Sequence, residues 1–357
     1  MAIRVCKKDS TEIIQQKLDQ GGTIIFDTGT YNIHGQLLIG ADTIINLNGA
    51  TLRRKGNFQS IFLNRCTTKT TKYKGEGNIH IMNGTFEGMG QYSADNLVTF
   101  FHSHDIFISN CKFLDTRCHA IEFNSTKHVM VSNCEFLGCN ADEAFREMIQ
   151  IDAAYTGGFW KSGSSYKSAC YDGTCCEDIT IYQCLFSKSK DRDYPSACIG
   201  THTQLYGGNT HKDIKILQNR FYCGGRDKDQ SCLSLIGMEN VQVFSNYFER
   251  CGRVARIYTK PYSYKLNGDK VVPKAGDGHS KNITFTDNVA GGSLATSNKC
   301  TGIYIDGLDI SNVTITNNRF KKSQDQEKYY VYVSKDGCEN LSVKDNITDL
   351  KFKMAKG

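Results

Sequence analysis

The chain has 357 residues, of which 39% are hydrophobic and 22% charged, with 33 glycines and only 3 prolines. This composition excludes disordered, collagen-like and proline-rich chains, and the length allows one long all-β domain or two average domains. The formal charge of +6 is spread along the chain without a Lys/Arg block, so we expect no nucleic-acid partner. No run of about 18 apolar residues occurs and no apolar signal segment follows Met1, so we expect no membrane insertion.

The first predicted element is a short helix near the N-terminus. Residues 9–12, Asp-Ser-Thr-Glu, carry capping side chains, and Ile13, Ile14 and Leu18 fall on one helical face. Residues 1–20 are therefore predicted to cap one end of the fold. Short strand-like segments follow from Gly21 onwards.

One phrase then recurs along the rest of the chain. It consists of an apolar-x-apolar strand, two or three polar residues that include Asn or Cys, and an aromatic residue. Its copies start 23 to 50 residues apart, at Ile79, Ile106, Val129, Ile179, Ile214, Val241, Ile283, Val313 and Leu341. A short period-2 strand repeated once per turn of chain predicts a solenoid whose coils stack strand on strand and share one core.

The polar position of this phrase is expected to form ladders through the stacked coils. Its occupants are Cys111, Cys134, Cys184, Asn219, Asn288, Asn318 and Asn346. Such stacking, at about 4.8 Å per step, explains part of the use of 16 cysteines. Buried free thiols are the first interpretation and disulfides the alternative. No Cys-x-x-Cys pair occurs, so we expect no metal site.

The N-terminal pattern carries a resemblance to a known family. A helix followed by Gly-Gly-Thr-Ile-Ile-Phe, Gly-Thr-Tyr and repeated Asn-Val/Ile-Thr-Ile phrases resembles the pectin-lyase-like superfamily of right-handed parallel β-helices. The resemblance implies an all-β, single-domain solenoid of about 9–11 coils that spans residues 1–357. The superfamily includes hydrolases, lyases, epimerases and phage tail-spike proteins, so the fold alone assigns no activity.

A second strand precedes most copies of the phrase, and its residues alternate between the core and the outer face. The outward residues form two columns. The first contains Glu122, Gln150, Gly200, Ser234, Arg256 and Tyr304, and the second contains Asn124, Asp152, His202, Ile236, Tyr258 and Asp306. Glu122 and Asp152 are thus expected on a diagonal, with Cα atoms about 8 Å apart, and His202 beside Asp152. Glu147 enters the Asp152 strand and is a secondary candidate.

Two long insertions, at residues 153–178 and 259–281, are expected to flank this outer face. The first holds Trp160, Tyr171 and Asp172, and the second holds Tyr262 and several lysines. Aromatic rings beside a polar surface suit stacking on sugar rings. The alternative is that these aromatic residues pack the insertions onto the solenoid.

The order of motifs is similar to that of polygalacturonase-type glycosidases, which carry acidic residues on successive coils, then Gly-His-Gly and Arg-Ile-Lys. The matching segments here are residues 124–126, 150–152, 200–202 and 256–258. Three features depart from the pattern: a paired Asp-Asp is absent, the histidine is displaced, and an extra coil at residues 233–236 precedes Arg256. One of Glu122 and Asp152 would protonate the leaving oxygen and the other would activate water, with His202 relaying protons. Arg256 would clamp a carboxylate or a pair of hydroxyls.

We therefore expect a glycoside hydrolase that cleaves a polysaccharide bound along the solenoid. The catalytic candidates are Glu122, Asp152, His202, Glu147 and Asp172. The substrate-binding candidates are Asn124, Gln150, Arg256, Tyr258, Trp160 and Tyr171. No cofactor is expected for hydrolysis, and the chain is expected to act as a monomer or a homotrimer.

Two alternatives stay open. A polysaccharide lyase or epimerase would abstract a proton from a uronic acid with Arg256, a Lys or His202, and its acidic residues could hold Ca²⁺. A tail-spike or adhesin module would bind a glycan without cleaving it. An extracellular, cell-surface or phage-particle location is favoured, although no signal peptide is visible.

Overall fold

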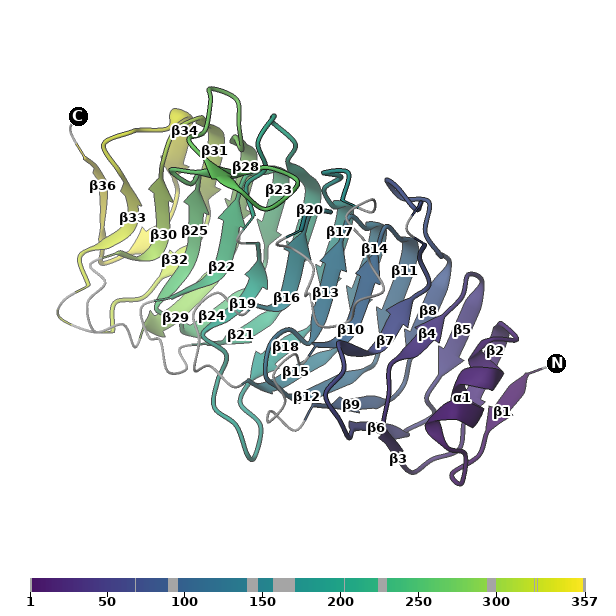
Figure 1. Cartoon of the computed structure of the whole chain (residues 1–357). Helices are drawn as coiled ribbons and strands as arrows, with labels where there is room; N and C mark the ends of the chain where they lie inside the picture. Colours follow the sequence, from purple (N-terminus) through teal and green to yellow (C-terminus); the bar gives the residue numbers. More distant parts are fainter. Residues whose placement is uncertain are drawn as a thin grey trace.

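The computed structural model describes residues 2–355 except residues 68, 89–95, 140–146, 157–170, 202, 224–229, 294–299, 324 and 326. The chain winds into a right-handed parallel β-helix with one short helix at its N-terminal end (Figure 1), as predicted. Each full coil adds one strand in turn to sheets A, B and C, so that strands distant in sequence become neighbours.

The strands of the three sheets have the following bounds. Sheet A consists of β1 (Ile3–Val5), β2 (Gly22–Phe26), β5 (Thr43–Asn46), β8 (Ile79–Met82), β11 (His104–Ser109), β14 (Lys127–Ser132), β17 (Glu177–Tyr182), β20 (His211–Leu217), β23 (Met238–Phe244), β28 (Ser280–Thr286), β31 (Ile310–Thr316) and β34 (Glu339–Lys344). Sheet B consists of β3 (Thr30–Ile33), β6 (Thr51–Arg54), β9 (Thr85–Glu87), β12 (Lys112–Thr116), β15 (Glu135–Cys139), β18 (Leu185–Ser187), β21 (Arg220–Tyr222), β24 (Tyr247–Arg250), β29 (Val289–Ser293), β32 (Arg319–Phe320) and β35 (Ile347–Thr348).

Sheet C carries the predicted site. It consists of β4 (Leu37–Ile39), β7 (Ser60–Asn64), β10 (Asn96–Phe101), β13 (Ile121–Asn124), β16 (Glu147–Asp152), β19 (Ala197–Gly200), β22 (Ser231–Ile236), β25 (Arg253–Tyr258), β30 (Cys300–Asp306), β33 (Tyr329–Val333) and β36 (Lys351–Met354). A small antiparallel hairpin, β26 (Ser263–Tyr264) and β27 (Lys270–Val271), stands outside the solenoid.

Identical residue types stack through the core because the coils keep their register. Six phenylalanines of sheet B stack face to face with ring centroids 4.7–5.2 Å apart: Phe86, Phe113, Phe136, Phe186, Phe221 and Phe248. An asparagine ladder continues the buried stack of Cys111, Cys134 and Cys184. It includes Asn246, which the sequence prediction omitted, between Asn219 and Asn288.

Helix α1 (Thr11–Leu18) covers the N-terminal end of the solenoid (Figure 1). Ser10 caps it by accepting a hydrogen bond from the Ile13 amide, and Ile14 and Leu18 are buried. Ile13 was expected on the buried face but is 41% exposed. The helix thus seals the core with a narrower apolar stripe than predicted.

The cysteines of the described residues are free thiols, and most are buried. This agrees with the first interpretation of the sequence and not with the disulfide alternative. No helix in the described ranges has the length and apolar character needed to cross a membrane.

Candidate functional site

The register of sheet C confirms the two predicted columns wherever both partners are described. Glu122 lies opposite Gln150 and Asn124 opposite Asp152. Further along, Arg256 pairs with Tyr304, and its neighbour two residues on, Tyr258, pairs with Asp306. Glu122 and Asp152 therefore occupy diagonal positions on β13 and β16. His202 and Trp160 lie outside the described residues, so their predicted positions stay untested.

The column residues on β13 and β16, which include Glu122, are buried, whereas the sequence predicted an open polar face. Glu122 is 4% exposed, and Asn124 is fully buried. The Glu122 carboxylate accepts a hydrogen bond of 2.9 Å from the Asn124 amide and a second one from the Asn96 amide of β10. Gln150, directly opposite Glu122, is also fully buried. A buried carboxylate needs such donors, because burial without them costs several kcal/mol.

Asp152, the last residue of β16, is 1% exposed. Its Oδ1 accepts hydrogen bonds from the hydroxyl of Thr201, at 3.3 Å, and from the hydroxyl of Thr203. The buried Tyr155 lies close to Asp152; burial, followed by the Asp152 charge, raises the pKa of its phenol. Asp152 thus ties the end of β16 to the turn that follows β19.

His211 is a buried neighbour of Asp152 that the sequence prediction missed. It begins β20, and its Nδ1 accepts a hydrogen bond of 3.1 Å from the Cys176 amide. Burial lowers the pKa of His211 to about 4, against the opposing effect of the Asp152 charge. The imidazole is therefore neutral near pH 7. The residue stands three positions before the copy of the repeated phrase that starts at Ile214, where no alternation marks it as facing the site.

The two remaining carboxylate candidates, Glu147 and Asp172, lie among contacts that hold the fold together. Glu147 begins β16, is 1% exposed, and its backbone carbonyl lies 2.6 Å from the His119 Nδ1. Asp172 accepts hydrogen bonds from the backbone amides of Lys72 and Thr174, at 2.7 and 3.0 Å. These contacts show Asp172 fastening a loop, and they bring it to neither Glu122 nor Asp152.

The described ends of the first insertion pack onto sheet C. Tyr171 lies edge-on to Phe101, with ring centroids 6.3 Å apart, beside Leu63 and Ala154. A second apolar cluster joins this insertion to the turn after β19 and to the hairpin, and it contains Ala153, Tyr155, Cys175, Leu205 and Tyr264. For Tyr171, packing onto the solenoid is therefore what the structure shows, and a sugar-stacking role is not required.

The exposed part of the site lies further along sheet C. Arg256 donates a hydrogen bond of 2.7 Å to Asp306, and its guanidinium carbon lies 3.6 Å from the ring centroid of Tyr258 and 5.6 Å from that of Tyr304. Burial raises the pKa of both phenols, with the charge of Arg256 opposing. Arg256 and Asp306 keep about a third and a fifth of their side chains exposed (33% and 22%).

Further cations and tyrosines extend this surface across the next two strands. Tyr332 of β33 lies 5.5 Å from Tyr304 and 5.6 Å from Tyr329 between ring centroids, and Lys353 of β36 lies over both Tyr329 and Tyr332. We call this surface the Arg–Tyr face; it comprises Arg253, Arg256, Tyr258, Tyr304, Asp306, Tyr329, Tyr332 and Lys353. Arg253, whose guanidinium carbon lies 5.2 Å from the Tyr304 ring centroid, was not predicted from the sequence. Tyr329, Tyr332 and Lys353 were not predicted either, although the alternation of Tyr329–Val333 marks a strand of this sheet.

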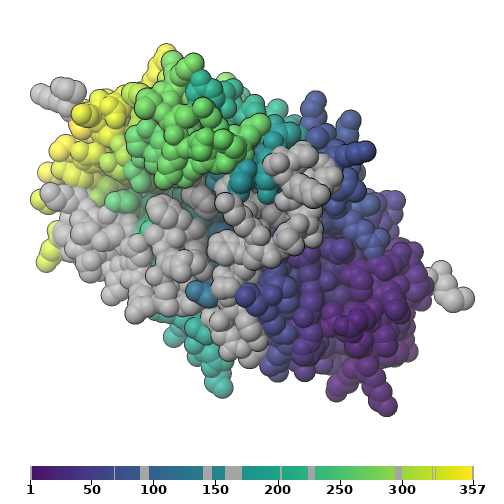
Figure 2. Space-filling model, in the orientation of Figure 1, coloured from purple at the N-terminus to yellow at the C-terminus, as the bar shows by residue number. Residues whose placement is uncertain are grey.

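The second insertion adds lysines beside the Arg–Tyr face, where its described surface is the green part of Figure 2. Lys260 donates a hydrogen bond of 3.1 Å to the Tyr262 phenol, and Lys270 lies 4.5 Å from the same ring. Burial acts to raise the pKa of Tyr262, but the two lysines together with Tyr264 lower it overall. The two lysines thus place positive charge beside this phenol.

Comparisons with known proteins show which proteins the chain resembles in sequence and in fold. No family model matches the sequence. Plasmin and fibronectin-binding protein A of Streptococcus pneumoniae is 25% identical over 309 residues, covering 73% of this chain and 41% of that protein. The chain thus spans about two fifths of the length of this curated relative (41%).

Solved structures extend the likeness. PfbA, a surface adhesin of Streptococcus pneumoniae, has a TM-score of 0.70 at 18% identity, covering 99% of this chain and 93% of that one. An endo-xylogalacturonan hydrolase from Aspergillus tubingensis has a TM-score of 0.59 at 14% identity, covering 100% and 99%. The A-module of a mannuronan C-5 epimerase from Azotobacter vinelandii has a TM-score of 0.57 at 10% identity, covering 98% and 96%.

These likenesses confirm the parallel β-helix fold of the chain. The similar proteins include an adhesin, a hydrolase and an epimerase, so the fold is common to binding proteins and to enzymes.

Proposed function

We propose that the protein binds an acidic polysaccharide along the Arg–Tyr face of sheet C, as a surface-exposed β-helix. The observation that carries this proposal is the partly exposed Arg256, held by Asp306 and flanked by the rings of Tyr258 and Tyr304. A guanidinium offers a planar pair of donors to a carboxylate or sulfate, and tyrosine rings offer apolar faces with polar tips to sugar rings. Arg256 and the two tyrosines are partly exposed, and their contacts with one another already orient them.

The spacing of the face suits a polymer. Arg256, Tyr304 and Tyr332 occupy one column on three consecutive strands. Neighbouring strands repeat every 4.7–4.9 Å or so, so a chain laid along the solenoid axis meets one side chain of the column per strand. A repeating ligand would therefore make the same kind of contact several times, which raises avidity without any single strong contact.

The similar adhesin supports a binding role at a cell surface. The relative from Streptococcus pneumoniae is named for binding plasmin and fibronectin. These two proteins therefore belong in the binding assay as alternative ligands of the same face.

Glycoside hydrolysis is the second candidate function, and the diagonal placement of Glu122 and Asp152 on adjacent strands favours it. In this mechanism one carboxyl group protonates the leaving oxygen and the other acts on water or on the sugar, with His202 as a proton relay. Both carboxylates already accept hydrogen bonds from protein donors, and both are buried. Hydrolysis would require these contacts to open when substrate binds. The binding role needs no such change.

One experiment separates the candidates. Immobilised neutral, uronic-acid and sulfated polysaccharides, together with plasmin and fibronectin, are tested for binding, and the same glycans are assayed for new reducing ends and for the ultraviolet absorbance of unsaturated products. We expect salt-sensitive binding to acidic glycans without product.

Matched variants locate the binding surface. Arg256→Ala and Tyr304→Ala should each weaken binding at least fivefold, whereas Arg220→Ala, an exposed arginine of sheet B, should not. Equal binding by all three variants would refute the Arg–Tyr face. Reducing ends that disappear in Glu122→Gln would establish the hydrolase instead, and unsaturated products would establish a lyase.

A further inference from the structure

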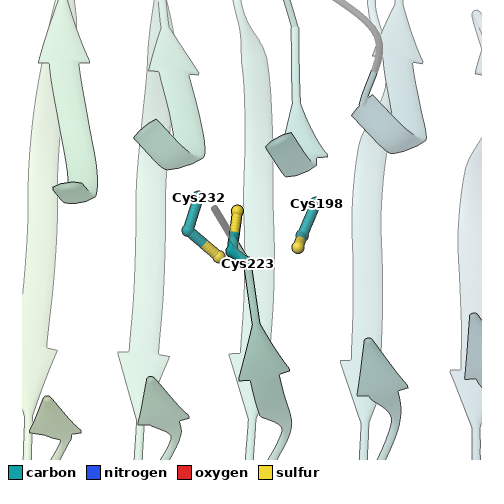
Figure 3. A group of neighbouring side chains, drawn as sticks. All are labelled: Cys198, Cys223 and Cys232. Atoms are coloured by element: carbon teal, nitrogen blue, oxygen red, sulfur yellow. The ribbon is translucent and has the colours of Figure 1, made fainter. Parts of the chain in front are cut away.

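Three buried cysteines converge inside the solenoid at the corner between sheets B and C (Figure 3). Cys198 lies in β19 and Cys232 in β22, while Cys223 directly follows β21. Their Sγ atoms all lie within 4.8 Å of one another. All three side chains are fully buried, so the sulfur atoms face each other without access to bulk water.

The register explains why the thiols meet. Ile199 pairs with Leu233, so Cys198 and Cys232, one residue earlier on each strand, are neighbours on adjacent coils. Cys223 reaches them from the end of a sheet B strand. The result is a triangle of sulfur atoms.

A fourth thiol adjoins this triangle. Cys251 follows β24, one coil beyond Cys223, and is 2% exposed. Its thiol interacts with the thiols of Cys223 and Cys232, although it lies outside the group of three whose sulfur atoms are all within 4.8 Å of one another. Four sulfur atoms from four segments of the chain therefore share one enclosed space.

We propose that Cys198, Cys223 and Cys232 bind a soft metal cation as thiolates, with Cys251 as the fourth ligand of a tetrahedral zinc site. Sulfur ligands select thiophilic ions such as Zn²⁺ and Cu⁺ over Mg²⁺ and Ca²⁺. A Zn–S bond of about 2.3 Å implies tetrahedral S···S separations near 3.8 Å or so. For Cys198, Cys223 and Cys232, the observed upper limit of 4.8 Å therefore requires only a small inward rotation of the side chains, and Cys251 has to move towards them to complete the tetrahedron.

Metal binding replaces thiol protons by the cation. The Cys223 thiol donates a hydrogen bond of 3.0 Å to the Ser196 carbonyl, and this bond is given up when the proton leaves. Each ligating thiol releases its proton to solvent as its Zn–S bond forms, and no electrons are transferred. Enclosure by core side chains keeps competing water away from the ion.

The buried stack of Cys111, Cys134 and Cys184 provides a matched control inside the same molecule. These thiols occupy one position on successive coils, so they form a line in which only neighbours are in contact. A line of this kind cannot surround one ion. The two clusters share residue type and burial and differ in shape.

The test uses the full chain, purified reduced and free of metal, and titrated with Zn²⁺ or with Co²⁺ as a spectroscopic probe. We expect one equivalent of metal per chain and the thiolate-to-cobalt charge-transfer absorption. Cys232→Ser should weaken Zn²⁺ binding at least 100-fold, and Cys134→Ser should leave it within threefold of wild type. Because Cys232→Ser could fail to fold, X-ray absorption of the wild-type zinc complex supplies a second measurement, which should show sulfur ligands only.

Four results would overturn the proposal. The first is the absence of stoichiometric metal binding by the reduced wild-type chain. The second is nitrogen or oxygen ligation in the X-ray absorption spectrum. The third is equal loss of metal in Cys134→Ser and Cys232→Ser. The fourth is a disulfide among Cys198, Cys223 and Cys232 in the protein as isolated from its natural compartment.

Discussion

Replacing Asp152 distinguishes an anchoring carboxylate from a catalytic one. The Asp152→Ala substitution leaves the hydroxyl groups of Thr201 and Thr203 without this acceptor in a buried setting. A hydrogen bond to a charged group contributes about 1.5–3 kcal/mol. The bond to Thr201 is long, at 3.3 Å, so we count it at the lower end and expect a loss of about 3–5 kcal/mol in the free energy of unfolding.

The Asp152→Asn substitution is the matched variant, since its amide oxygen can still accept both hydroxyl hydrogens. We expect it to cost about 1–2 kcal/mol, because only the charge-assisted part of the two bonds is lost. Urea denaturation, monitored by far-ultraviolet circular dichroism, gives the free energy of unfolding of both variants and of wild type. Glycan binding and reducing-end release are measured on the same samples.

The two variants give opposite outcomes under the two roles. An anchor predicts that Asp152→Ala unfolds at much lower urea concentration, while Asp152→Asn loses only the smaller amount given above and keeps its glycan binding. An Asp152→Ala chain as stable as wild type would refute the anchoring argument. Catalytic activity present in wild type and abolished in Asp152→Asn at unchanged stability would assign Asp152 to the hydrolase mechanism.

Three further predictions follow from the core. Acidification should destabilise the protein as pH falls from about 6.5 towards 4, because burial lowers the pKa of His211 to about 4 and the unfolded chain takes up the proton first. Urea midpoints measured across this range should depend less on pH in His211→Asn than in wild type. The control His128→Asn, at an exposed histidine, should show the same pH dependence as wild type. Asn288→Ala should lower the free energy of unfolding by about 3 kcal/mol, since Asn288 forms hydrogen bonds with Asn246, Asn318 and the Val243 carbonyl. Asn346→Ala, at the half-buried end of the ladder, should lower it by less than half as much, and equal losses would contradict the ladder. Phe136→Ala should cost about 3–5 kcal/mol because its ring stacks between Phe113 and Phe186, and the 40% exposed Phe107 provides the control that should lose little.

The fold was predictable from the sequence because a solenoid repeats its local rule. Alternation places Ile149 and Ile151 inward, and the repeated phrase places Phe113 and Phe136 at the same point of successive coils. The register between coils then follows, since any shift would bury a polar residue of the phrase. For the same reason the columns that pair Glu122 with Gln150 and Arg256 with Tyr304 could be derived before the structure was known.

The surroundings of these columns were not predictable in the same way. Alternation says that Glu122 and Asp152 leave the core, but it does not say what covers them outside it. Their burial depends on contacts with Asn96, Thr201 and Thr203, which lie on other coils or beyond the strand ends. His211 was missed for this reason too, because its contact with the Cys176 amide is made outside the repeated phrase.

The same distinction explains the cysteine cluster. The stack of Cys111, Cys134 and Cys184 repeats one position and could be predicted from the sequence. The convergence of Cys198 and Cys223 joins a sheet C strand to the end of a sheet B strand, and no single periodicity connects them. Search rules for metal sites look for short spacings within one segment. In a solenoid, the ligands of one site come from successive coils, so their sequence separation is set by coil length.

Periodic stacking also bears on the choice between binding and catalysis. A catalytic centre needs one set of groups arranged about one bond, so it must break the repeat at a single place. The Arg–Tyr face instead repeats cationic and aromatic side chains over consecutive strands, from Arg256 and Tyr258 to Tyr332 and Lys353. A surface with the period of the solenoid matches a ligand that has its own repeat, and each strand adds a contact of similar strength. The geometry of sheet C therefore favours recognition of a polymer along its length over chemistry at one point.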